Sequence, residues 1–294
     1  MLDGLELSIV ETLPFLHQQK PAFPEFEKWV LQKHNGHIDS AIRERINRAV
    51  TDRLAGRHTR YPITLETDEP VFDNHDWACW EENGYIVLKE AVPREDCETL
   101  EKAIWEYLKL RPDEPETWRT RNETFWVHGF RHPLLDKNRR SRRIHRAFAQ
   151  LWGTEELFHS VDRLSFNPPM GEEHRQFGPS NLHWDDSIAQ PLSFDILGVM
   201  YLNDVQPNQG AFQCVPGFHR QIGAWLDSLP PDADPRQEIL DAFEPVKIGG
   251  KAGDLIIWRQ ELPHGSSVNR ADYPRFAQYM AMYPADRAIN PVWK

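Results

Sequence analysis

A histidine and an aspartate near residue 184 have the types and the spacing of metal ligands. In the stretch NLHWDDSIAQP, residues 181–191, His183 and Asp185 are separated by Trp184. Side chains at positions i and i+2 of a β-strand share one face, so both groups can reach the same ion while Trp184 points away. Asp186 would then lie on the opposite face, which makes Asp185 the better candidate ligand and leaves the role of Asp186 open.

His264 is the best candidate for a third ligand. It follows the β-rich run GDLIIW, residues 253–258, and lies between a proline and a glycine. A histidine in such a tight corner, with small neighbours, can present its ring at the mouth of a barrel. Two histidines and one carboxylate on one side of an ion leave other coordination positions open, an arrangement typical of non-haem Fe(II) oxygenases. Open positions are needed there because a co-substrate and O2 must both bind.

Arg275 supplies a positive charge eleven residues after His264, at the start of the last predicted strand. A guanidinium group can hold a carboxylate through two parallel hydrogen bonds. A 2-oxoglutarate site needs such a group, because the distal C5 carboxylate of this co-substrate must be anchored. Ser266 can donate a hydrogen bond to the same carboxylate. The HxD pair alone is a weak signal, and its combination with His264 and Arg275 makes the prediction specific.

The other histidines are poorer candidates for a metal site. His128 and His132 are spaced like a helical pair, but the intervening Gly-Phe and the following Pro133 disfavour a long helix. His219 comes just after a turn and is predicted to be structural. Four further histidines lie in the helical N-terminal part without a partner at ligand spacing: His17, His34, His37 and His58.

The strands that would carry these candidates are predicted in the second half of the chain. From about residue 160, short β-rich runs such as VDRLSFNPP, ILGVMYLND, AFQCVPG and FAQYMAMYP alternate with turn signals rich in Pro, Gly, Asn and Asp. Many short strands with frequent turns predict an antiparallel sandwich or barrel. The insert HRQIGAWLDSLPPDADPRQEILDAFEP, residues 219–245, interrupts them and is expected to be partly helical.

The first half is predicted to be mostly helical. Residues 41–56 show apolar side chains at helical spacing, and residues 60–73 form an extended connector. Residues 83–112 predict a strand, a turn and a helix that Pro112 ends. The expected fold is therefore α+β, mainly β in its core, with helices that buttress one face of the sheet. We expect a helical N-terminal extension over residues 1–70 and one main domain over residues 71–294.

Composition excludes several classes of partner. The chain of 294 residues carries a net charge of −11, which argues against nucleic acid and against an anionic membrane. One local exception is KNRRSRRIHR, residues 137–146, where six of ten residues are Lys or Arg. This stretch is either a solvated helix face or a dock for an anionic substrate or partner.

The sequence also predicts a soluble protein of a reducing, cytoplasmic compartment. Its three cysteines, Cys79, Cys97 and Cys214, are far apart and show no CxxC pairing. The N-terminal residues lack the positive segment of a signal peptide. No apolar run approaches the roughly 20 residues that cross a bilayer.

Residues from about 75 to 285 resemble the phytanoyl-CoA dioxygenase family of Fe(II)- and 2-oxoglutarate-dependent oxygenases. The resemblance rests on NGYIVLKEAVP, RLSFNPP, HWD, NQGAFQCVPGFHR, GKAGDLIIW and LPHGSSVNRADYPRFAQYMAMYP. It implies a double-stranded β-helix, or jelly roll. The residues to which it gives roles are the iron ligands His183, Asp185 and His264, the C5-carboxylate anchors Arg275 and Ser266, and Arg163 and Tyr201 on strands that line the co-substrate pocket in relatives.

The resemblance implies a hydroxylase that acts on a small-molecule substrate. Family members that halogenate replace the ligand acid by a small residue, whereas this chain keeps Asp185. The expected reaction places a hydroxyl group on an unactivated C–H bond and converts 2-oxoglutarate and O2 to succinate and CO2. Two alternatives remain, a jelly-roll sensor that binds metal and 2-oxoglutarate without turnover, and a cupin-like metalloenzyme that does not use 2-oxoglutarate. The identity of the substrate is left open.

Overall fold

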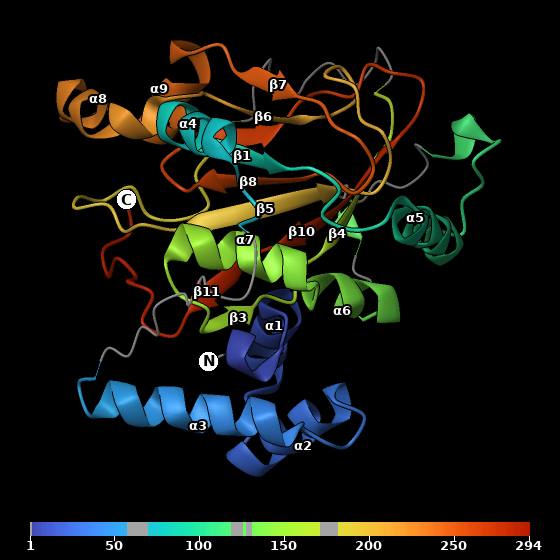
Figure 1. The fold of residues 1–294 in the computed structure, drawn as a ribbon, viewed down its shortest axis with the longest axis vertical. Helices are drawn as coiled ribbons and strands as arrows, with labels where there is room; N and C mark the ends of the chain where they lie inside the picture. Colours follow the sequence, from blue (N-terminus) through green and yellow to red (C-terminus); the bar gives the residue numbers. More distant parts are fainter. Residues whose placement is uncertain (1, 58–69, 119–125, 128–130, 171–181) are drawn as a thin grey trace.

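The computed structural model describes residues 2–57, 70–118, 126–127, 131–170 and 182–294. Within them, six strands form one antiparallel sheet in the order β1-β8-β5-β10-β4-β2 (Figure 1). The strands of this large sheet are β1 (Tyr85–Leu88), β2 (Trp126–Val127), β4 (Leu164–Asn167), β5 (Ile196–Tyr201), β8 (Leu255–Arg259) and β10 (Arg275–Met280). A small antiparallel sheet has the order β7-β6-β9 and consists of β6 (Phe212–Cys214), β7 (Val246–Ile248) and β9 (His264–Ser266).

The two sheets pack face to face because side chains alternate along their strands. On β8, Ile256 and Trp258 are buried in one cluster with Phe212 of the small sheet. Leu255 and Ile257, on the opposite face of the same strand, belong to a second buried cluster that includes helical residues. The large sheet is therefore covered on both faces, by the small sheet on one side and by helices on the other.

Three helices cover the outer face of the large sheet, namely α5 (Arg94–Leu108), α6 (Pro133–Arg139) and α7 (Arg142–Trp152). Ile144 and Phe148 of α7 are fully buried in the same cluster as Met200 of β5. Helix α5 ends earlier than the sequence predicts, because Lys109 adopts a left-handed conformation three residues before Pro112. Helix α4 (Asn74–Asn83) precedes β1, and the insert contributes α8 (Ile222–Ser228) and α9 (Pro235–Ala242).

The N-terminal part forms a short 3-10 helix η1 (Asp3–Leu5) and the helices α1 (Ile9–Gln19), α2 (Phe23–Lys33) and α3 (Ser40–Leu54). This group lies against a two-stranded sheet of β3 (Leu157–His159) and β11 (Met282–Pro284), at the end opposite to the small sheet (Figure 1). Arg45 of α3 donates to the carbonyl of Leu157 and stacks on Phe158. The predicted helix 41–56 is thus found, while most of the predicted connector 60–73 lies outside the described residues.

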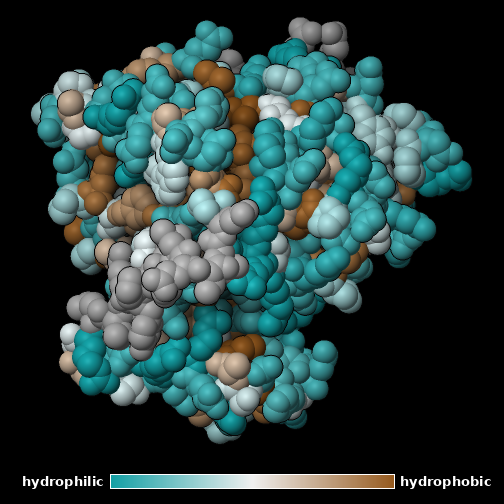
Figure 2. All heavy atoms as spheres, in the orientation of Figure 1, coloured by the Kyte–Doolittle hydropathy of each residue, from teal (hydrophilic) through white to brown (hydrophobic). Residues whose placement is uncertain are grey.

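Strand β11 corrects one detail of the sequence prediction. Arg275 begins β10, but β10 is not the last strand, because β11 follows and pairs with β3. No helix in the described part of the chain is long and apolar enough to cross a membrane. Most of the face seen in Figure 2 is hydrophilic.

Candidate functional site

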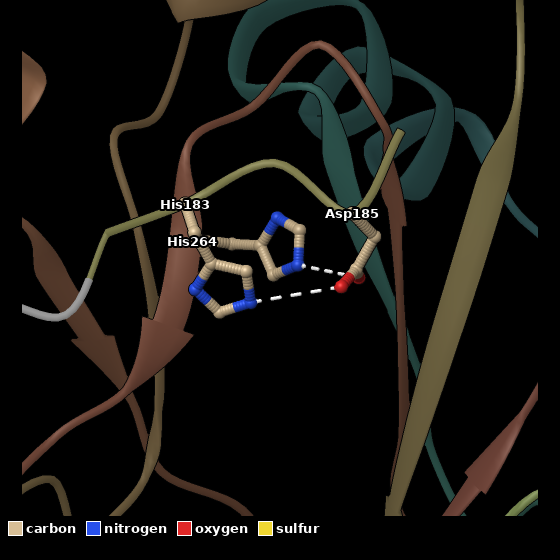
Figure 3. Close-up of side chains that lie close together, drawn as sticks. All are labelled: His183, Asp185 and His264. Carbon is tan, nitrogen blue, oxygen red and sulfur yellow. Dashed lines mark hydrogen bonds and ion pairs between the residues drawn. The ribbon is translucent and has the colours of Figure 1, made fainter. Parts of the chain in front are cut away.

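His183, Asp185 and His264 converge on one point (Figure 3). Each offers one ligand atom, and these atoms all lie within 4.8 Å of one another. His264 Nε2 is 3.1 Å from Asp185 Oδ2, and His183 Nε2 is 3.7 Å from Asp185 Oδ1. The arrangement therefore gathers two imidazoles and one carboxylate around a space that a cation can occupy.

A backbone bridge sets the two histidines side by side. His183 and His264 exchange both main-chain hydrogen bonds, at 2.9 and 3.0 Å, so that β9 continues onto the segment that carries Asp185. The ring of His264 is 4% exposed and lies 4.9 Å from the ring of Trp258, centroid to centroid. This packing restricts the rotamer of His264 before any ligand binds.

A hydrogen bond fixes the tautomer of His264. Its Nδ1 lies 3.0 Å from the carbonyl oxygen of Leu262, and because a carbonyl only accepts, Nδ1 carries the proton. In the neutral ring Nε2 then directs a lone pair toward the Asp185 carboxylate. A lone pair and a carboxylate oxygen 3.1 Å apart repel each other unless a proton or a metal cation lies between them. The donor set therefore fits a divalent metal ion.

The surroundings of Asp185 favour its ionised form. Burial by itself raises the pKa of this carboxyl, although 53% of the side-chain surface is exposed. When a proton lies between His264 and Asp185, that hydrogen bond and the positive charges of His264, His183 and Arg163 outweigh burial and lower the pKa of Asp185 to about 2. Asp185 is thus ready to bind a cation at neutral pH.

The segment around Asp185 is less regular than a strand. Only His183 makes a β-bridge, and the chain bends at Asp185 and Asp186. Trp184 does point away from the ligand cluster, as predicted, since it is buried and its Nε1 donates to the carbonyl of Glu261 at 3.0 Å.

Asp186 lies outside the ligand cluster and acts on a different charge. Burial raises the pKa of Asp195 to about 7 despite its ion pair with Arg287, and the negative charge of Asp186 adds to this shift. Asp186 is therefore part of the electrostatic surroundings of Asp195.

Arg275 is a buried cation whose described contacts are all neutral. It is 1% exposed, and its Nη1 and Nη2 donate to the hydroxyls of Ser266 at 2.9 Å and Ser165 at 3.1 Å. Its Nε finds no acceptor, and it has no carboxylate within ion-pair distance, among the described residues. A buried charge is stable only when it is compensated. Arg275 thus fits an anionic ligand group such as a carboxylate.

Arg275 and the ligand cluster line the same cavity, which has a volume of about 260 Å³. Arg163 also lines it, with its guanidinium carbon 3.8 Å from the ring centroid of Trp126 and its Nε 3.4 Å from Asp162. Further lining comes from Phe212, Trp258, Gly265, Tyr279 and Met280. The cavity therefore combines two separated polar sites with aromatic walls.

Tyr201 lies on β5, a strand that lines the cavity through Leu197 and Val199, but its own side chain is placed differently. It is fully buried between the two sheets and is not among the residues that line the cavity. Its hydroxyl donates to the carbonyl of Ile248 at 2.7 Å and accepts from the amide of Phe212 at 2.8 Å. These bonds join β5 of the large sheet to β6 and β7 of the small sheet, so the described role of Tyr201 is structural.

The other polar candidates lie apart from the cavity. His132 caps α6 by accepting from the amide of Leu134, and His219 makes a hydrogen bond with the carbonyl of Glu81. His128 is outside the described residues. In the basic stretch 137–146, Arg139 is buried and paired with Asp136, and Arg140 pairs with Glu6. None of this stretch lines the cavity, and it is in part an internal dock for the N-terminal helices.

Ser165 is a site residue that the sequence analysis missed. It lies two positions after Arg163 on β4 and is fully buried beside Arg275. The rule that places His183 and Asp185 on one side also places Ser165 on the side of Arg163. The alternation of side chains within RLSFNPP was therefore enough to predict that Ser165 shares a face with Arg163.

Comparisons with known proteins agree on one family. The sequence profile of the family described as "Phytanoyl-CoA dioxygenase (PhyH)" matches residues 80–277. A putative phytanoyl-CoA dioxygenase of Dictyostelium discoideum is 23% identical over 268 residues, covering 72% of this chain and 76% of its own length. The ectoine dioxygenase of Sphingopyxis alaskensis is 27% identical over 237 residues, covering 71% and 75%.

Solved structures show the same fold at low identity. The structure of EctD from S. alaskensis with 2-oxoglutarate and 5-hydroxyectoine superposes with a TM-score of 0.53 and 19% identity, covering 79% of this chain and 85% of that chain. The non-heme alpha ketoglutarate dependent carbocyclase SnoK from nogalamycin biosynthesis gives a TM-score of 0.53 and 16% identity, covering 79% and 90%.

Proposed function

The chain belongs to the phytanoyl-CoA dioxygenase family, and on this premise we propose that it is a non-haem Fe(II)- and 2-oxoglutarate-dependent dioxygenase. Its reaction is the hydroxylation of an unactivated C–H bond of a small molecule, with release of succinate and CO2. The observation that carries the proposal is the presence, in one cavity, of a two-histidine, one-carboxylate cluster and a buried arginine without an anionic partner among the described residues.

His183, Asp185 and His264 are the residues that would hold the iron. Bound Fe(II) supplies the redox chemistry by which O2 and 2-oxoglutarate are activated. The protein contributes the ionised Asp185 and the Nδ1-protonated His264, whose free Nε2 faces the cluster. Because one carboxylate and two imidazoles occupy only part of a coordination sphere, this ligand set leaves room for co-substrate and O2.

Arg275, Ser266 and Ser165 are the residues that would bind the C5 carboxylate of 2-oxoglutarate. The two serine hydroxyls orient the guanidinium group, and Ser266 can turn its own hydrogen toward the ligand. A carboxylate on Arg275 would compensate the buried charge and give its Nε an acceptor. This anchor would exclude water from the inner end of the cavity.

Arg163 and the aromatic walls are the part of the cavity that would face the substrate. Arg163 is stacked on Trp126 and lies beside Asp162, and no described hydrogen bond joins it to Ser266 or Ser165, which favours contact with substrate over contact with the C5 carboxylate. Tyr201 is withdrawn from the proposed co-substrate contacts, since its hydroxyl is used between the sheets.

The fold supports the same assignment. Two facing antiparallel sheets, with the ligand cluster where β9 bridges to His183, are what a double-stranded β-helix requires. We assign residues 71–294 to this jelly roll and residues 1–70 to a helical extension that docks on β3 and β11.

The test is an anaerobic titration with Fe(II) and 2-oxoglutarate, followed by succinate measurement in air. The parent protein should develop a visible charge-transfer band and then form succinate slowly without added substrate. Asp185→Ala should lose both and keep the thermal stability of the metal-free parent. A parent protein that gives neither band nor succinate, with any substrate, would exclude the proposal. A band without turnover would instead indicate a sensor.

A further inference from the structure

Arg236 touches the segment of the proposed iron ligands from outside the cavity. Its Nη1 donates to the carbonyl of Trp184 at 2.7 Å, and its Nη2 donates to the carbonyl of Asp186 at 2.9 Å. These two carbonyls flank Asp185. One planar guanidinium therefore spans the bend on which the Asp185 carboxylate is mounted.

Helix α9 holds Arg236 in place for these contacts. Pro235 begins the helix, and the Asp234 carboxylate caps it by accepting from the amide of Arg236 at 2.9 Å. Ile239, one turn later, is fully buried in the cluster between the sheets. The first turn of α9 is thus fixed at both its cap and its core contact.

The last residues of the chain complete the same contact. Arg236 Nη2 also donates to the main-chain oxygen of Lys294 at 3.1 Å, and the guanidinium carbon lies 5.0 Å from the ring centroid of Trp293. Ser187, next to Asp186, donates to the carbonyl of Val292 at 2.6 Å. The ligand-bearing bend is therefore enclosed between α9 and residues 292–294.

We propose that Arg236 is a positioning residue that sets the orientation of Asp185 toward the metal. The inference rests on the proposed function. A bend in which two partly buried carbonyls point to one side is stabilised by a donor pair there, because carbonyls withdrawn from water without partners destabilise that conformation. Without the guanidinium the bend at Asp185 and Asp186 relaxes, and the carboxylate loses its fixed direction toward His183 and His264.

If Arg236 had only a structural role, its loss would lower the melting temperature and leave the metal affinity unchanged. Arg236 does not touch the cavity, so its loss removes no ligand atom and leaves the charge inside the cavity unchanged. Groups that orient metal ligands typically change metal affinity by about 10- to 100-fold when removed. We therefore expect Arg236→Ala to weaken metal binding by about this factor while the protein stays folded.

The experiment measures Mn(II) affinity on the whole protein, from the electron paramagnetic resonance signal of the free ion, together with the melting temperature. Arg236→Ala should show a dissociation constant at least about tenfold above that of the parent. Added ethylguanidinium should restore the affinity, since it can occupy the vacated site. Arg220→Ala is the matched control, because Arg220 lies on the same insert and is exposed. It should bind Mn(II) as the parent does.

Parental affinity in Arg236→Ala would overturn the inference, and so would a loss that ethylguanidinium leaves unchanged. If Arg236→Ala does not fold, Arg236→Lys is measured by the same criterion, because it keeps the charge but lacks the two-pronged donor. Trp293→Ala should give a smaller loss in the same direction. A parent protein that binds no Mn(II) would contradict the proposed function itself, whereas parental binding with an unaffected Arg236→Ala contradicts only this inference.

Discussion

Asp185 and Arg275 carry opposite charges in different surroundings. Asp185 faces two imidazoles and stays ionised, with a pKa of about 2 because the histidines outweigh the effect of its burial. Arg275 has two neutral serines and, among the described residues, no anion. A cation completes the first site and an anion completes the second. The cavity therefore selects a metal and a carboxylate together.

Arg275→Gln should raise the KM for 2-oxoglutarate by about 30-fold or more. Truncating one partner of a buried, hydrogen-bonded charge pair costs about 2–5 kcal/mol, and 1.4 kcal/mol corresponds to a factor of ten. Succinate formation at varied 2-oxoglutarate measures this shift. Arg270→Gln, at an exposed position, serves as the control. An unchanged KM in Arg275→Gln would contradict the use of 2-oxoglutarate at this site.

The convergence of His183, Asp185 and His264 was predictable from sequence because strand periodicity and side-chain type both point to these residues. His183, Asp185 and His264 do meet, and Trp184 does turn away. The bend at Asp185 and Asp186 was not predictable, because the guanidinium that bonds to its carbonyls belongs to Arg236, some fifty residues further on in the insert. Periodicity in the sequence predicts which face of a helix or strand a residue occupies, but it does not predict a contact between segments that are far apart in the chain.

Among the elements, the strands of the large sheet follow the period-2 pattern most closely. Ile256 and Trp258 face the small sheet, and Leu255 and Ile257 face the helices. Tyr201 obeys the same alternation, yet its side of the strand is packed against β6 and β7 and does not open into the cavity. Alternation thus predicts the face of a residue, and the position along the strand decides whether that face is packed or open.

Tyr201→Phe should destabilise the fold and leave the KM for 2-oxoglutarate unchanged. The substitution leaves the carbonyl of Ile248 and the amide of Phe212 buried without their partner. Each unsatisfied group costs about 1–3 kcal/mol, so we expect a loss of about 2 kcal/mol or more. Urea unfolding measures it, with Tyr107→Phe at an exposed site as control. A raised KM for 2-oxoglutarate with unchanged stability would indicate instead that Tyr201 contacts the co-substrate.

Strand β3 makes the docking of the N-terminal helices sensitive to acid. Burial, followed by the charges of Arg140, Arg139 and Arg45, lowers the pKa of His159 to about 3, although Glu6 lies 3.4 Å away. In the unfolded chain this histidine titrates near 6.5. Between these values only the unfolded state binds the proton, so stability is present at pH 7 and is lost as the pH falls.

We expect protonation of His159 in the unfolded chain to remove about 2 kcal/mol of stability between pH 7 and pH 5. Each pH unit below the unfolded-state pKa of 6.5 costs about 1.36 kcal/mol. Urea unfolding at the two pH values measures the total change, and His159→Gln should reduce it by about that amount. His37→Gln, at an exposed position, should not. Equal pH dependence in the parent and His159→Gln would show that this histidine is not buried in its neutral form.

For the whole molecule, the proposed metal site joins segments that are far apart in the chain. The ligands come from residues 183–185 and from β9, and the supports come from α9 and residues 292–294. Their convergence depends on the two sheets and the insert being in place at once. A ligand that binds only this folded arrangement stabilises the entire chain by mass action.

Mn(II) at about 100 times its dissociation constant should stabilise the protein by about 2.7 kcal/mol. For a chain of this size we expect a rise in melting temperature of about 4 °C. Differential scanning calorimetry with and without metal measures the rise, and a chelator should reverse it. Asp185→Ala should melt at the same temperature under both conditions. A metal-dependent rise that persists in Asp185→Ala would place the stabilising ion elsewhere.

The contact between Arg236 and the Asp185 bend restricts how this enzyme can be redesigned. Inserts between strands are natural units for grafting when a new specificity is wanted, and residues 219–245 look like such a unit because they lie between β6 and β7. Yet the insert carries Arg236, which holds the carbonyls on either side of Asp185. A transplanted insert that lacks an arginine at the matching position would change the metal site together with the specificity. Loop exchange in this chain should therefore retain residues 234–239 and vary only the remainder of the insert.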